Sequence, residues 1–167
     1  SHTTIYHWIQ TYVAIIKKYV DQFKPRLSCV WQADETFISF KGKKEHTKLV
    51  LPQKGHYCWI MIDTGSRFVL NMHLGQDKSL EEGMEFFEKI KDIYPDIPEV
   101  VCTDGNISYQ TCMKRFYPDA KHVLLRLITL KPNTSVIERM NGTVKNRTKT
   151  MRCFDEFIPC QNWLTLF

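Results

Sequence analysis

The order of strand-like and helix-like segments constrains the fold of this chain more than any other feature of its sequence. Residues 28–40 are rich in β-branched and aromatic residues, which favours a long strand. Two further strand-like runs, 57–62 and 67–74, flank Asp63-Thr64-Gly65-Ser66, in which Asp and Gly suit a tight hairpin turn. These three runs predict an antiparallel meander.

Helices and strands alternate in the second half of the chain. Apolar residues at helical spacing follow Ser79, and Glu82 three residues later predicts a capping box. The remaining patterns predict a strand at 99–103, a helix at 107–116, a strand at 121–125, a long helix from about 135 to near 154 and an apolar helix after 155. This order is that of the ribonuclease H-like fold. We therefore expect an α/β protein with a five-stranded mixed sheet flanked by helices.

The N-terminal segment has the apolar spacing of a helix over residues 3–20, with Thr3 or Thr4 as its N-cap and Pro25 beyond its end. Its first residues, S-H-T-T-I-Y-H-W, look like the second helix of a helix-turn-helix, and an ordinary packing helix is the alternative. We expect residues 1–24 to be the remnant of a DNA-binding region with its linker, and residues 25–167 to form the catalytic core. The lysine-rich stretch 41–55 reads as a loop.

Composition limits the class of protein. The net charge is +5, with 23 Lys and Arg against 18 Asp and Glu, which favours a polyanionic partner. The six cysteines form no C-x-x-C pair and the histidines are scattered, so we expect reduced cysteines, no zinc site and a cytoplasmic protein. The longest apolar runs span about six residues, far fewer than the roughly 20 of a membrane helix.

Three acidic residues stand where this fold would bring them together: Asp34 in the first strand, Asp104 directly after the fourth strand, and Glu138 at the start of the long helix. Open α/β sheets place their sites at the carboxyl ends of parallel strands, which suits Asp104. Mg²⁺ prefers carboxylate oxygens, and a carboxylate cluster can hold two ions about 3.5–4 Å apart. Such a cluster suits phosphodiester chemistry.

Each of these carboxylates also has an ordinary interpretation. Asp34 would be an exposed strand residue, Asp104 would cap the next helix, and Glu138 would be a first-turn carboxylate favoured by the helix dipole. Glu35 follows Asp34 directly. Because neighbouring strand residues face opposite sides, we expect only one of this pair to point into a common site.

The long helix separates its side chains into two faces. At 100° per residue, with Glu138 as zero, Lys145, Lys149 and Arg152 lie within about 40° of it and Asn141 lies about 60° away. The opposite face is apolar and contains Val136, Ile137, Met140, Val144 and Met151. We expect the apolar face to pack on the sheet and the basic stripe to contact DNA phosphates, and a solvated lysine face is the alternative.

Three blocks resemble the DDE transposases of bacterial and archaeal insertion sequences, most closely the IS-six family. They are W-x-x-D-E-T-F-I at 31–38, V-x-T-D-G-N-x-S-Y at 101–109, and N-T-S-V-I-E-R-M-N-G-T-V-K-N-R-T-K-T-M-R-C-F at 133–154. The blocks occur in the family's order, and the third is the most specific. The resemblance covers nearly the whole chain.

The resemblance implies an integrase-type, ribonuclease H-like core that cuts donor DNA at transposon ends and joins the 3′-hydroxyl to target DNA. It implies that Asp34, Asp104 and Glu138 are catalytic and hold two Mg²⁺ ions, for which Mn²⁺ can substitute. The residues expected to bind DNA are Asn141, Lys145, Lys149 and Arg152. The expected partners are the terminal inverted repeats, target DNA and a second copy of the chain, with neither a membrane nor a small-molecule substrate, in the nucleoid of a prokaryotic cell.

The sequence departs from the family pattern in three places. Residues 43–54 look like an insertion between the first two strands, and Cys153 stands where the family usually has glycine. The chain also begins inside the helix-turn-helix and ends before the family's usual C-terminus. The alternative function is therefore a truncated or repurposed protein that binds DNA or a partner without catalysis.

Overall fold

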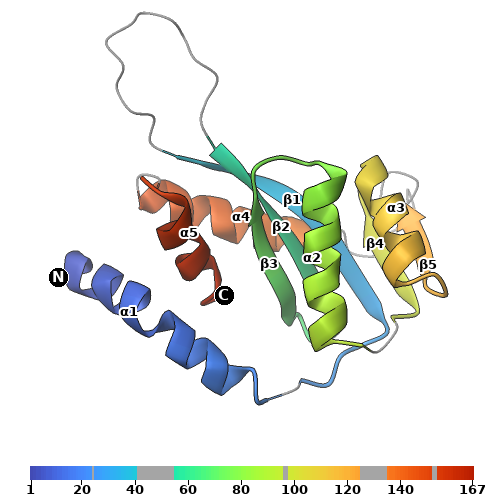
Figure 1. The fold of residues 1–167 in the computed structure, drawn as a ribbon, viewed down its shortest axis with the longest axis horizontal. Helices are drawn as coiled ribbons and strands as arrows, with labels where there is room; N and C mark the ends of the chain where they lie inside the picture. The colour runs from blue at the N-terminus through green and yellow to red at the C-terminus, as the bar shows by residue number, and fades with distance from the viewer. Residues whose placement is uncertain (24, 41–54, 96–97, 125–134, 152–153) are drawn as a thin grey trace, which may run out of the picture.

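The computed structural model describes residues 1–167 except 24, 41–54, 96–97, 125–134 and 152–153 (Figure 1). The elements are α1 (His2–Val20), β1 (Val30–Ser39), β2 (Gly55–Asp63), β3 (Val69–Gly75), α2 (Leu80–Ile93), β4 (Val100–Thr103), α3 (Ile107–Phe116), β5 (Lys121–Leu124), α4 (Ser135–Thr150) and α5 (Phe157–Leu164). The predicted order of strands and helices is confirmed. The 43–54 insertion, Arg152 and Cys153 lie outside the described residues.

The strands form one five-stranded sheet in the order β3-β2-β1-β4-β5. The pairs β1–β2 and β2–β3 are antiparallel, whereas β1–β4 and β4–β5 are parallel. This mixed sheet is the predicted ribonuclease H-like arrangement. The parallel β4–β5 ladder ends at the pair Thr103 and Leu124, so the carboxyl ends of β4 and β5 share one edge of the sheet.

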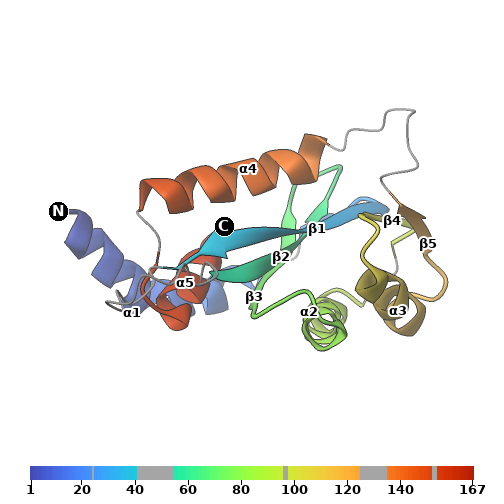
Figure 2. The ribbon, with the colours of Figure 1, turned by 90° about the horizontal axis from the view of Figure 1, so that it is seen from above.

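Helices cover both faces of the sheet (Figure 2). One apolar cluster joins Trp31, Trp59 and Met61 of the sheet to α2 and α3, and the other joins Ile60 and Ile62 to α4 and α5. Alternation along β2 sends neighbouring residues into different clusters, as the pleat requires. The predicted apolar face of α4 is confirmed. Ile137 and Val144 are fully buried, and Val136, Met140 and Met151 pack against the same cluster.

Some local predictions differ from the structure. Ser1, and not Thr3 or Thr4, is the N-cap of α1, since its hydroxyl accepts a bond from the Thr4 amide. The capping box of α2 is half formed. Ser79 Oγ accepts from the Glu82 amide, but the Glu82 carboxylate binds the Gln76 amide and His73. The long helix ends at 150, earlier than expected.

No helix in the described part of the chain is long and apolar enough to cross a membrane. The five cysteines that the structure describes, 29, 58, 102, 112 and 160, are free.

Asp63 ties the start of β1 to the β2–β3 turn. Its side chain is buried and accepts bonds from the amides and hydroxyls of Ser28 and Ser66. Burial alone raises the pKa of Asp63, but these hydrogen bonds outweigh burial and lower the pKa below its usual value. A carboxyl with a lowered pKa stabilises the fold when it is ionised, above the pKa of the unfolded chain.

Asp63→Asn should therefore destabilise the protein by about 1–3 kcal/mol at pH 7, because hydrogen bonds to a charged acceptor are lost. The difference from wild type should shrink as the pH falls below about 4, through the lowered pKa, since the wild-type carboxyl then also becomes neutral. Urea unfolding at several pH values measures both quantities. A difference that stays constant with pH would contradict this role for the charge.

Candidate metal centre

Three carboxylates meet beside the C-terminal end of β4. One oxygen each from Asp34, Glu35 and Asp104 lies within 4.8 Å of the other two. Asp34 and Glu35 come from the middle of β1, and Asp104 follows the last residue of β4. Asp34 and Asp104 are thus brought together, as the sequence predicts. Carboxylate oxygens are the ligands that Mg²⁺ and Mn²⁺ prefer, so this donor set fits such an ion.

The prediction that only one of Asp34 and Glu35 can point into a common site is wrong. The two side chains do leave opposite faces: Asp34 contacts α4, and Glu35 contacts the start of α3. However, the last residue pair between β1 and β4 is Gln32 with Cys102. No described strand pairs with β1 on that side between Ala33 and Ser39, so the carboxylates from both faces reach the same open edge.

Hydrogen bonds hold each of the three carboxylates. Asn106 is central, because its amide N–H donates to Asp104 Oδ1 at 2.9 Å and its side chain donates to Glu35 Oε1 at 2.8 Å. Asn106 also caps α3 through the Ser108 amide. Lys78, just before α2, places its ammonium 3.3 Å from Glu35 Oε2. The start of α3 and the turn before α2 therefore fix one side of the site.

The electrostatics of the site disfavour unbalanced negative charge. The Glu35 side chain is fully buried, and Asp34 is half-buried. Burial raises the pKa of Asp34 and of Glu35, and the negative charge of Asp104 raises both pKa values further. The positive charge of Lys78 lowers the pKa of both carboxyls and so opposes these effects. Closely spaced carboxylates that resist ionisation are a common property of metal and catalytic sites.

Glu138 does not belong to this cluster in the part of the chain that the structure describes. It is exposed in the first turn of α4. One turn later, Asn141 is buried, and its side-chain Nδ2 donates to Asp34 Oδ2 at 2.7 Å. Asn141 Oδ1 is also buried and has no hydrogen-bond partner among the described residues. The structure therefore places Asn141 within the site, and not on the DNA-facing surface that the sequence predicts.

The two lysines of the predicted basic stripe, Lys145 and Lys149, are exposed on α4. They lie one and two turns beyond Asn141 on the same helix. Arg152 was predicted to extend this stripe, but it lies outside the described residues.

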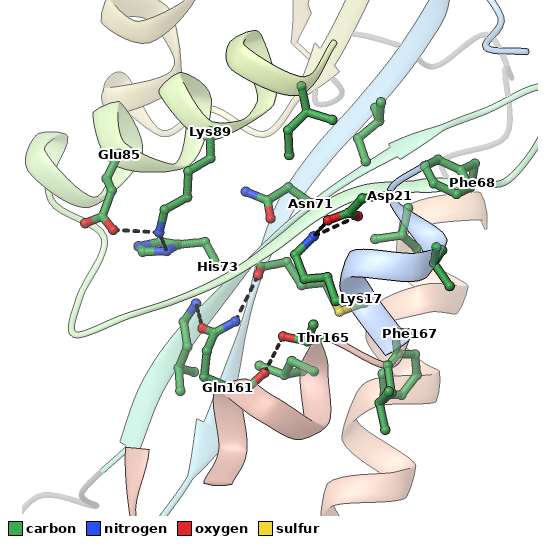
Figure 3. A pocket seen from close by; sticks show the side chains of 18 of the residues that line it. Lys17, Asp21, Phe68, Asn71, His73, Glu85, Lys89, Gln161, Thr165 and Phe167 are labelled. Atoms are coloured by element: carbon green, nitrogen blue, oxygen red, sulfur yellow. Dashed lines mark hydrogen bonds and ion pairs between the residues drawn. The ribbon is translucent and has the colours of Figure 1, made fainter. Parts of the chain in front are cut away.

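A second group of potential ligands, His73, Glu82 and Glu85, lies on β3 and α2. Each of these three side chains already has a partner. His73 Nε2 is 2.7 Å from Glu82 Oε2. Lys89 lies 3.3 Å from His73 Nδ1 and 2.6 Å from Glu85 Oε1, as Figure 3 shows. Sequence spacing did not reveal this group, since its members come from different elements. It borders a groove of about 630 Å³ between α1, β3, α2 and α5, whose lining contains none of the three clustered carboxylates.

The fold and the acidic cluster define a class of protein, the ribonuclease H-like cores. Two solved structures have the same fold. The catalytic core domain of BIV integrase is 16% identical, with a TM-score of 0.56, covering 83% of this chain and 81% of that one. The HTLV-2 integrase catalytic core domain in complex with magnesium is 18% identical, with a TM-score of 0.51, covering 77% of this chain and 74% of that one.

The sequence comparison defines the family more closely. Residues 28–165 match a family described as a DDE domain, the transposase domain of the IS240 type. A transposase for the insertion sequence-like element IS431mec of Staphylococcus aureus is 31% identical over 55 residues, which cover 33% of this chain and 25% of that relative. This chain belongs to the DDE transposase family, within the IS-six group. The resemblance predicted from the three sequence blocks is confirmed.

Proposed function

We propose that this chain is the catalytic core of a DNA transposase, which cleaves phosphodiester bonds at transposon ends and transfers the strand to target DNA. The observation that carries the proposal is the convergence of Asp34 and Asp104 at the carboxyl end of β4 in a chain of the DDE family. The aligned segment spans only a quarter of the IS431mec transposase, so the activity of a whole transposase is part of the proposal.

Asp34, Asp104 and Glu138 are the residues that we propose to hold two Mg²⁺ ions, with Mn²⁺ able to substitute. Bound there, the ions would activate the attacking water or 3′-hydroxyl and stabilise the leaving oxygen. Asn141 supports this assignment because it fixes Asp34 through a 2.7 Å hydrogen bond. The other Asp34 oxygen, Oδ1, accepts a hydrogen bond from the Glu35 amide at 2.9 Å.

Glu138 is the component of the site that requires a change in structure. It is one turn from Asn141 on the helix that packs over Asp34, and therefore near the cluster without belonging to it. We propose that a small shift or rotation of the first turn of α4 brings Glu138 to the metal ions when DNA and metal bind. Coulomb attraction between the Glu138 carboxylate and a divalent ion favours this movement.

DNA is the proposed partner, both as terminal inverted repeats and as target. Lys145 and Lys149 are exposed on the helix that leads away from the cluster, which suits contacts to phosphates. Such contacts give affinity that falls with salt and does not depend on sequence. We further propose that the chain forms a homodimer and acts at the nucleoid. We also propose that residues 1–24 are the remnant of a helix-turn-helix.

The test is a strand-cleavage and strand-transfer assay on DNA that carries the terminal repeats of the element. We expect nicked and joined products in Mg²⁺ or Mn²⁺ and none with a chelator. Glu138→Gln should remove product while leaving DNA binding unchanged. Binding to the repeats without cleavage in either metal would reject the enzymatic proposal and leave a DNA-binding protein.

A further inference from the structure

We infer that Glu35 is a third carboxylate of the metal centre and binds the same ion as Asp34 and Asp104, with Lys78 as the cation that balances it in the metal-free protein. This inference rests on the proposed function, because it concerns the same site. It adds a residue that strand alternation would assign to the opposite face of the sheet.

The first support is the distance between the oxygens. The three carboxylates offer one oxygen each, all within 4.8 Å of one another. Oxygens bound to one Mg²⁺ at about 2.1 Å lie at most about 4.2 Å apart, twice that bond length. The cluster is therefore within an ångström of the span that a single ion requires, before Glu138 contributes anything.

The second support is charge. Three carboxylates face one another, and the Lys78 ammonium lies 3.3 Å from Glu35 Oε2. With all groups ionised, these three acids and Lys78 carry a net charge of −2 within the described structure, and the Glu35 side chain is fully buried. Buried charge that is not balanced is strongly unfavourable. A divalent cation supplies the missing charge.

The third support is that the polar groups around the cluster are not saturated. A carboxylate has about four acceptor sites, and among the described residues Glu35 Oε2 accepts from Lys78, Glu35 Oε1 accepts from Asn106, and the Tyr109 hydroxyl also interacts with Glu35. On the other side of the cluster, Asn141 is 8% exposed, and its buried Oδ1 atom has no hydrogen-bond partner in the described structure, although its Nδ2 donates to Asp34. An acceptor without a partner beside a carboxylate cluster is suited to a bound ion or its water.

The alternative is that Glu35 only positions Asn106 and Lys78. Glu35→Gln separates the two roles, because glutamine keeps the carbonyl oxygen that accepts from Asn106 and removes the charge. We expect Glu35→Gln to weaken Mn²⁺ binding at least tenfold, measured by electron paramagnetic resonance of free Mn²⁺. Its melting temperature without metal should equal or exceed that of wild type, since a buried like charge is removed, and the increase in melting temperature caused by Mn²⁺ should be smaller.

Three further variants complete the experiment. Asp34→Asn and Asp104→Asn should lose Mn²⁺ binding, whereas Glu88→Gln, an exposed carboxylate of α2 outside both acidic groups, should bind as wild type does. If Glu35→Gln binds Mn²⁺ as tightly as wild type while the two aspartate variants do not, Glu35 is only a positioning residue and the proposed function survives. If both aspartate variants bind Mn²⁺ normally, the proposed metal site itself is wrong.

Lys78→Met gives a test that does not depend on altering the buried acid. The lysine side chain is 39% exposed, so the variant should fold. The Lys78 ammonium lies 3.3 Å from the proposed ligand oxygen Glu35 Oε2. Its removal should tighten Mn²⁺ binding severalfold, since Mn²⁺ then no longer competes with the ammonium for this oxygen. Unchanged or weaker binding would overturn the assigned role of Lys78 and of the Glu35 charge with it.

Discussion

Asp104→Asn should lower metal-dependent cleavage and strand transfer by about 10³-fold or more. The substitution keeps a side-chain oxygen that can accept from the Asn106 amide, now 2.9 Å from Asp104 Oδ1, so the turn into α3 should persist. It removes the negative charge on which the metal centre depends. Loss of about 4 kcal/mol of transition-state stabilisation, a moderate value for a metal ligand, corresponds to about 10³-fold in rate.

The measurement is the rate of product formation on labelled terminal-repeat DNA, with DNA affinity and melting temperature measured in parallel. Asp119→Asn is the matched control, because Asp119 is exposed in the turn after α3. It should behave as wild type in all three assays. Full activity of Asp104→Asn would show that this carboxylate does not take part in the chemistry.

Trp59→Ala should cause the largest loss of stability, about 3–5 kcal/mol. The side chain is fully buried, and its ring centroid lies 5.9 Å from that of Phe86 and 5.4 Å from that of Tyr109. Gly83 packs α2 closely against this region, since a Cβ there would lie 3.2 Å from Cys112 Sγ of α3 and 3.4 Å from the Trp59 ring. Alanine would leave a cavity at the point where the sheet, α2 and α3 meet.

The same substitution should also affect the metal centre. Trp59 Nε1 donates to the Asp77 carbonyl at 3.2 Å, directly before Lys78, and Trp59 pairs with Glu35 across β1 and β2. Loss of the indole should therefore loosen the turn that presents Lys78. Thermal unfolding should show a decrease of about 6–20 °C for a protein of this size.

Trp8→Ala is the control for the loss of a tryptophan in general. Trp8 is 59% exposed on α1, so its removal should change the free energy of unfolding by less than about 1 kcal/mol. Similar losses for the two variants would contradict the central packing role assigned to Trp59.

The sequence was sufficient to predict the elements and most of the architecture. Local patterns indicate strands, helices and turns directly, so the meander, the later alternation and the apolar face of α4 follow from spacing alone. The same reasoning placed Asp104 after a parallel strand, where it is found. The cap of α1 and the end of α4 were less accurate because helix ends depend on a few competing hydrogen bonds.

The site was only partly predictable. Asn141 was assigned to the DNA-facing side by a helical projection, but its side chain turns to Asp34. A projection gives the direction of a residue around a helix, and it does not give the crossing of that helix over the sheet. For the same reason, the sequence did not indicate that Glu138 would stand outside the acidic cluster while Asn141, one turn later, contacts it.

The three clustered carboxylates, Asp34, Glu35 and Asp104, show what the sequence determines and what only the tertiary structure decides. The sequence by itself determined that Asp34 lies on the first strand, that Asp104 follows the fourth, and that the chain belongs with the DDE transposases. Only the tertiary structure decided that Glu35 joins them. Strand alternation assigns neighbouring side chains to opposite faces of the sheet, but the two side chains stay apart only where a paired strand lies beside them. Here the β1–β4 pairing stops at Gln32 and Cys102, so side chains from both faces meet at the open edge of β1.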